Sequence, residues 1–128
     1  MPTNNFWDTI KWFKEKEFDS PDLPGSGQYM NQSFVEILDR IRAKIGKPMK
    51  INSGYRTPEH NVKVKGVVNS SHLKGIAADI YVPDNNFRFL LVKSAIAEGI
   101  TRFIIHRTYL HIDMDYSKDQ NIMELNLE

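Results

Sequence analysis

Two stretches of the chain carry apolar residues at the spacing of an α-helix. The first, NQSFVEILDRIRAKIGKP at residues 31–48, places five apolar side chains on one face: Phe34, Ile37, Leu38, Ile41 and Ile45. Ser33 and Glu36 form an S-x-x-E pattern that is typical of a helix start, and a glycine and a proline follow the last apolar position. The second stretch, FRFLLVKSAIAEG at residues 87–99, has the same spacing and also ends in glycine. Both stretches are predicted to be helices.

Shorter apolar runs predict strands at residues 49–52, 77–82, 102–106 and 109–115. Between the first two runs, TPEHNVKV predicts a short helix, with Thr57 as its N-cap and Pro58 at its first helical position. This set of elements predicts an α+β fold, with a central antiparallel sheet of about four strands and the helices packed on one side.

The last two strand-like runs are separated by two residues, which predicts a hairpin with a two-residue turn. In that register His106 lies opposite Tyr109. Ile104 then lies opposite His111. Because side chains alternate across a strand, one face of the hairpin is apolar and belongs to the core: Phe103, Ile105, Leu110, Ile112 and Met114. The other face is polar and rich in possible metal ligands: His106, Tyr109, His111, Asp113 and Asp115.

The rest of the chain gives weaker signals. Residues 6–18 carry aromatic side chains among charges, which predicts a short helix or strand that docks through its aromatic rings. The prolines and glycines of FDSPDLPGSG, residues 18–27, exclude a regular element and predict either a plain connection or a flap bordering a binding cleft. We expect one domain over the 128 residues, made of an N-terminal segment, a core and a tail: 1–32, 33–115 and 116–128.

Composition narrows the chemistry. The chain has no cysteine, which excludes disulfides, thiolate metal sites and a cysteine nucleophile, and leaves histidine, aspartate and glutamate as strong metal ligands. The net charge is +1 and the signs are interspersed, so nucleic acid is not an expected partner. The sequence shows no signal peptide and no apolar run long enough to span a membrane, and we expect a monomer without a membrane partner.

His72, Asp79 and His111 are candidate ligands of one divalent metal ion. If the chain bends at Gly75 and then enters a strand, His72 and Asp79 converge with His111 from the hairpin. Two imidazoles and one carboxylate leave a coordination position open for water, which is the pattern of a catalytic zinc site. Spacing alone, however, favours ordinary hydrogen-bonded side chains over a metal site.

A resemblance to a known family changes this balance. SSHLKGIAAD, residues 70–79, matches every fixed position of S-x-H-x-x-G-x-A-x-D, a signature of the zinc D-Ala-D-Ala carboxypeptidase and L-alanyl-D-glutamate endopeptidase family. Upstream, INSGYRT is similar to the S-G-Y-R segment of that family, and downstream YLHIDMD is similar to its second histidine motif. The likeness covers about residues 33–115 and implies the fold that this family shares with the Hedgehog signalling domain. In overall length and in the lack of an export signal, the chain is similar to members encoded by small bacteriophages.

The resemblance implies Zn²⁺ as the cofactor, with three ligands: His72, Asp79 and His111. Ser70 would orient His72 or its loop from behind, the alternative being a plain turn residue. Arg56 would bind the developing oxyanion or a substrate carboxylate, the alternative being a structural ion pair.

The acid or base is the point at which the chain departs from the family pattern. Many relatives place this residue three positions before the last zinc histidine, where this chain has Thr108, which cannot titrate usefully. Asp113 is the leading replacement because it shares a strand face with His111, and His106 is the second. Either residue would alternatively orient a ligand from behind.

The predicted function is that of a zinc peptidase, a hydrolase that cleaves peptidoglycan stem peptides beside a D-residue, as a carboxypeptidase or an endopeptidase. Its expected role is cell-wall degradation by a bacteriophage, as in an endolysin, after synthesis in the host cytoplasm and either release or a separate export route. The alternative is a non-catalytic zinc-stabilised domain that binds wall peptide or a protein partner. Thr108 keeps that alternative open.

Overall fold

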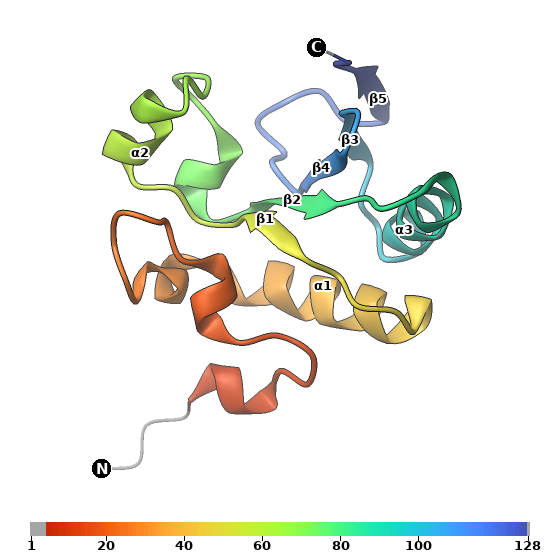
Figure 1. The fold of residues 1–128 in the computed structure, drawn as a ribbon, viewed down its shortest axis with the longest axis horizontal. Helices are drawn as coiled ribbons and strands as arrows, with labels where there is room; N and C mark the ends of the chain where they lie inside the picture. The colour runs from red at the N-terminus through yellow and green to blue at the C-terminus, as the bar shows by residue number, and fades with distance from the viewer. Residues whose placement is uncertain (1–4, 128) are drawn as a thin grey trace.

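The computed structural model describes residues 5–127 and centres on one sheet of five strands (Figure 1). The strands are β1 (Ile51–Ser53), β2 (Ala77–Tyr81), β3 (Arg102–Ile105), β4 (Tyr109–Asp113) and β5 (Ile122–Leu125). Their order across the sheet is β1-β2-β4-β3-β5. Residues 1–4 and 128, which the sequence analysis assigns to the N-terminal segment and to the tail, lie outside the described residues.

The α+β fold is confirmed, but the sheet differs from the expected one by an additional strand and by one parallel pair. The tail, for which no element was predicted, forms β5, and this strand runs parallel to β3. The remaining pairs are antiparallel. The parallel pairing of this strand with β3 cannot be identified from local turn chemistry, because no tight turn joins parallel strands.

The predicted hairpin register is confirmed. Ile104 pairs with His111 across β3 and β4, and the His106 N–H donates to the Tyr109 carbonyl at 3.0 Å. Alternation along β4 then sends Leu110 and Ile112 to one face and His111 and Asp113 to the other.

Within residues 5–127, three α-helices lie beside the sheet: α1 (Gln32–Ile45), α2 (Pro58–Lys63) and α3 (Asn85–Ala97). The N-cap of α1 is Asn31, whose side chain accepts from the Phe34 N–H at 3.0 Å. The expected capping box of Ser33 and Glu36 is therefore wrong, because the helix begins earlier, at a residue that also caps well. Thr57 caps α2 as predicted, accepting from the His60 N–H.

The main core lies between one face of the sheet and the helices α1 and α3. In Figure 1, α1 runs beneath the strands and α2 lies on their other side. Fully buried side chains from both helices meet the apolar face of the sheet: Phe34, Val35, Leu38, Ile41, Leu91, Ala78, Ile80, Leu110 and Ile112. Among the described residues, α2 contributes nothing to this cluster. The polar face of β2 and β4 is thereby left to form a site.

Residues 6–18 form two short 3₁₀ helices, η1 (Phe6–Thr9) and η2 (Glu15–Phe18). Phe13 and Phe18 are buried in the core, so docking through aromatic rings is confirmed. The following loop includes a third 3₁₀ helix, η3 (Ser26–Tyr29), and is fixed to the start of α2, where the Thr57 hydroxyl donates to Asp22 at 2.6 Å. No helix within residues 5–127 has the length and apolar character needed to cross a membrane.

Candidate metal centre

His72 lies in η4 (Ser71–Lys74), a single 3₁₀ turn that connects the loop at residues 64–70 to β2. Ser70 is its N-cap, and the Ser70 hydroxyl accepts from the His72 N–H at 3.2 Å. Gly75 ends the turn with φ 71°, and a side chain there would collide with the Tyr29 carbonyl. A left-handed residue without a side chain is what this bend requires. The S-x-H-x-x-G spacing therefore turns His72 back over β2.

The segment before α2 holds the ring of His72 from behind. The Nδ1 atom of His72 lies 2.7 Å from the Gly54 carbonyl oxygen, and the Arg56 N–H donates to the His72 carbonyl at 3.2 Å. Gly54 itself packs against Phe18 so closely that a Cβ would lie 2.8 Å from the Phe18 Cα. The S-G-Y-R segment thus links the buried N-terminal aromatics to one candidate ligand.

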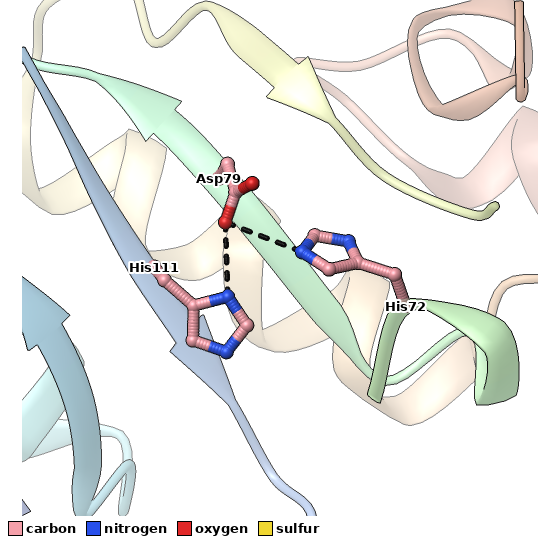
Figure 2. Close-up of side chains that lie close together, drawn as sticks. All are labelled: His72, Asp79 and His111. Atoms are coloured by element: carbon pink, nitrogen blue, oxygen red, sulfur yellow. Dashed lines mark hydrogen bonds and ion pairs between the residues drawn. The ribbon is translucent and has the colours of Figure 1, made fainter. Parts of the chain in front are cut away.

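Asp79 and His111 lie directly opposite each other on β2 and β4, on the polar face. Asp79 Oδ1 lies 2.9 Å from His111 Nδ1 and 3.2 Å from His72 Nε2 (Figure 2). One possible ligand atom from each of the three residues falls within 4.8 Å of the other two. All three side chains are nearly inaccessible to solvent. The structure therefore brings together the three residues that the sequence singled out.

The hydrogen bonds of the two rings show that this cluster fits a cation. A carbonyl oxygen only accepts, so His72 Nδ1 carries a proton, and a neutral ring then directs its Nε2 lone pair at Asp79. On the other side, His111 Nε2 lies 2.7 Å from Asp113 Oδ2 and its Nδ1 faces Asp79. Neutral rings would thus place two nitrogen lone pairs against one carboxylate oxygen. A divalent cation shared by the three groups satisfies all of them.

The pKa values point the same way. Burial alone would raise the pKa of Asp79, but its contacts with the His111 and His72 rings outweigh this effect and hold that pKa well below its usual range. Burial would lower the pKa of His111, yet hydrogen bonds to Asp113 and Asp79 raise it. The site therefore favours positive charge beside an anionic Asp79, whether a proton on His111 or a divalent cation carries that charge.

Asp113 lies behind His111 rather than in the open cleft. Its side chain is fully buried, and its Oδ2 accepts from Arg102 Nε at 3.0 Å in addition to contacting His111. Its Oδ1 accepts from the Asp115 N–H at 3.0 Å. Both oxygens are occupied, so these contacts suit a residue that orients His111, the second of the two roles considered for Asp113.

Arg56 reaches the centre from the segment before α2. Its Nη2 lies 3.3 Å from Asp79 Oδ2, its Nε donates to the Ser53 hydroxyl at 3.1 Å, and its Nη1 donates to the Asn61 side chain at 3.2 Å. A guanidinium has N–H groups to spare after these contacts, since each terminal nitrogen keeps one. Arg56 is thus fixed in place and still able to bind an anion.

The three candidate ligands line a cavity of about 310 Å³, together with Arg56, Val64, Ile104, His106, Tyr109 and Glu124. His106 stacks on Tyr109 with ring centroids 4.0 Å apart. Burial lowers the pKa of His106, outweighing the nearby carboxylate of Asp79. Thr108, at the position that is acidic in many relatives, is exposed at the hairpin turn.

Two further cavities adjoin this one. A cavity of about 170 Å³ shares Arg56 and Val64 with it and is bordered by Asp19 and Pro21 of the N-terminal loop. On the other side, a cavity of about 360 Å³ shares Ile104, His111 and Glu124. The candidate metal centre therefore lies within an extended groove, and the loop at residues 18–27 borders one end of it.

Several residues that support or line the site were missed by the sequence analysis. Glu124 lies on β5, and its sequence IMELNL does alternate polar and apolar residues, which was a usable signal. The sequence predicts Arg102 as the first residue of a strand and gives no sign of its contact with Asp113. The carbonyl of Gly54 carries no side-chain signal at all.

An α+β fold that places two imidazoles and a carboxylate in a groove has the features of a catalytic metal centre, in which three protein groups leave a position for water or substrate. A family model described as Peptidase M15 matches residues 11–113. Because this match covers most of the chain, the protein belongs to the Peptidase M15 family, a family of zinc peptidases. The resemblance carried by the histidine motifs is thereby confirmed. No curated protein matches the chain.

Proposed function

We propose that the protein hydrolyses peptide bonds in peptidoglycan stem peptides, with Zn²⁺ held by His72, Asp79 and His111. The observation that carries this proposal is the convergence of these three groups in a groove of a Peptidase M15 chain. The ring tautomers fixed by Gly54 and Asp113 support it, because they leave the inner nitrogens free to act as ligands.

Bound zinc would supply Lewis-acid chemistry, lowering the pKa of a water molecule and polarising the substrate carbonyl. The protein contributes the remaining parts of the reaction. Arg56 is placed to bind the oxyanion that develops on the carbonyl oxygen, or a carboxylate of the substrate. Asp113 and Ser70 hold His111 and His72 in place.

The groove favours one mode of cleavage over the other. Cavities continue past the centre on both sides, so peptide residues can lie on either side of the bond to be cut. We therefore favour cleavage within a stem peptide over removal of a single terminal D-residue. In the organism this activity would serve cell-wall degradation by a bacteriophage.

The test is hydrolysis of a defined stem peptide, with products identified by mass. The zinc-loaded protein is expected to release a new amine, and a chelator is expected to abolish this while added zinc restores it. The masses identify the cleaved bond. A protein that binds zinc and stem peptide but yields no new amine would instead be the non-catalytic binding domain that Thr108 leaves open.

A further inference from the structure

Glu124 lies in the same row of the sheet as two candidate ligands. Asp79 pairs with His111, His111 with Ile104, and Ile104 with Glu124. Paired residues of neighbouring strands point to the same face, so Glu124 shares the face of Asp79 and His111. At about 4.8 Å per strand, two strand spacings separate the backbones of His111 and Glu124, and Ile104 between them forms part of the cavity wall.

The side chain of Glu124 is open to the groove and uncommitted. It lines both the cavity at the centre and the adjoining cavity of about 360 Å³. It is exposed, and within residues 5–127 its carboxylate makes neither a hydrogen bond nor an ion pair. Every other carboxylate near the centre is already engaged: Asp79 with both imidazoles, Asp113 with Arg102 and His111.

We propose that Glu124 is the acid–base residue of this peptidase, an inference that rests on the proposed function. Its carboxylate takes a proton from water as the water oxygen bonds to the scissile carbonyl carbon. It then gives that proton to the departing nitrogen as the C–N bond breaks. One water and one amide are consumed, one acid and one amine are formed, and Glu124 returns to its starting state.

Three other residues serve this role less well. Thr108 cannot titrate usefully, and Asp113 is fully buried with both oxygens occupied. His106 lines the same cavity, but its ring is stacked on Tyr109 and lies one row away from Asp79 and His111. β5 thus supplies a carboxylate in place of the acidic residue that many relatives carry at the position of Thr108.

Two measurements on Glu124→Gln test this. On a cleavable stem peptide, kcat/KM is expected to fall by about 10²–10⁴-fold, while zinc affinity and thermal stability stay at wild-type values. Glu36→Gln, an exposed glutamate on α1 outside the groove, is the matched control and should leave kcat/KM unchanged. His106→Gln, assayed in parallel, should lose less activity than Glu124→Gln.

The second measurement needs no substrate. Acetohydroxamic acid loses a proton when it binds zinc, and calorimetry in buffers of different ionisation enthalpy shows where that proton goes. The wild type is expected to retain it on Glu124, whereas Glu124→Gln should release it to the buffer. Equal proton release by both proteins, or wild-type kcat/KM in Glu124→Gln, would overturn the proposal. An inert wild type that still differs from Glu124→Gln in proton release would overturn the proposed function but support this placement of Glu124.

Discussion

Each ring nitrogen of His111 contacts a carboxylate, and the two contacts have different roles. Nδ1 faces Asp79 inside the cluster, whereas Nε2 lies against Asp113, which Arg102 holds in turn. A carboxylate behind a metal-binding imidazole fixes the ring and raises its basicity. This contact determines what a change at Asp113 should do.

Asp113→Asn is expected to weaken zinc binding by about 10–100-fold, because the amide cannot hold the His111 ring and the partly buried Arg102 loses its counter-charge. Competition with a chromophoric chelator measures the affinity. Asp8→Asn, an exposed acidic residue in η1, is the control and should bind zinc like the wild type. Wild-type zinc affinity combined with lost turnover would instead make Asp113 a proton carrier.

Gly54 is a second position where a small change, the addition of one Cβ atom, should affect both stability and zinc binding. Gly54→Ala would place a Cβ 2.8 Å from the Phe18 backbone, and neither side can move cheaply because Phe18 is buried in the core. We expect a loss of about 1–3 kcal/mol in the free energy of unfolding, together with weaker zinc binding because the Gly54 carbonyl orients His72. Urea unfolding measures the first effect. Asn52→Ala, exposed on β1, should show neither loss.

Asp115 makes most of the contacts that tie the connection from β4 to β5 to η4. Asp115 accepts from the Ser71 hydroxyl at 2.7 Å, from Lys74 at 3.1 Å and from Ser117. Burial would raise the pKa of Asp115, but these hydrogen bonds hold it well below its usual range. The turn that carries His72 and the segment leading to Glu124 therefore depend on the same carboxylate.

This predicts a specific dependence of stability on pH. Because the folded protein lowers the pKa of Asp115, the contribution of this residue is fully present above the unfolded pKa near 3.8 and is lost as pH falls through the lower folded value. The free energy of unfolding should thus fall more steeply with decreasing pH in the wild type than in Asp115→Asn. The difference is expected over a range of roughly pH 5 to pH 3, around that unfolded pKa. Urea titrations across this range measure both slopes, and parallel curves would contradict the assignment. At pH 7 the variant should be less stable by about 2–3 kcal/mol.

Local sequence predicted some of these elements well and others not at all. The hairpin register followed from strict alternation across a two-residue turn, and the bend at Gly75 followed from motif spacing. The start of α1 was misplaced because Asn31 and Ser33 are both good caps, and their competition is decided by the chain that precedes them. β5 was missed because its partner β3 is parallel and lies across an intervening loop, a choice set by tertiary packing.

The core and the candidate metal centre occupy opposite faces of the sheet. Apolar side chains from α1, α3 and the strands form the core without any of the candidate ligands. The fold therefore has its own source of stability, unlike small metal-dependent domains that unfold without zinc. Zinc should add to the stability of a protein that is already folded.

Removal of zinc should consequently lower Tm without unfolding the protein. A ligand that binds only the folded state stabilises it by about 2.7 kcal/mol at a free concentration of 100 times its Kd, which corresponds to roughly 10 °C for a chain of this size. Circular dichroism of the chelator-treated protein should show native secondary structure at 25 °C and a cooperative transition at the lower Tm. His111→Gln separates this linkage from a general salt effect, because its Tm should not respond to zinc. An unfolded metal-free protein would mean that the cluster of imidazoles and carboxylates, and not the apolar core, decides whether the chain folds.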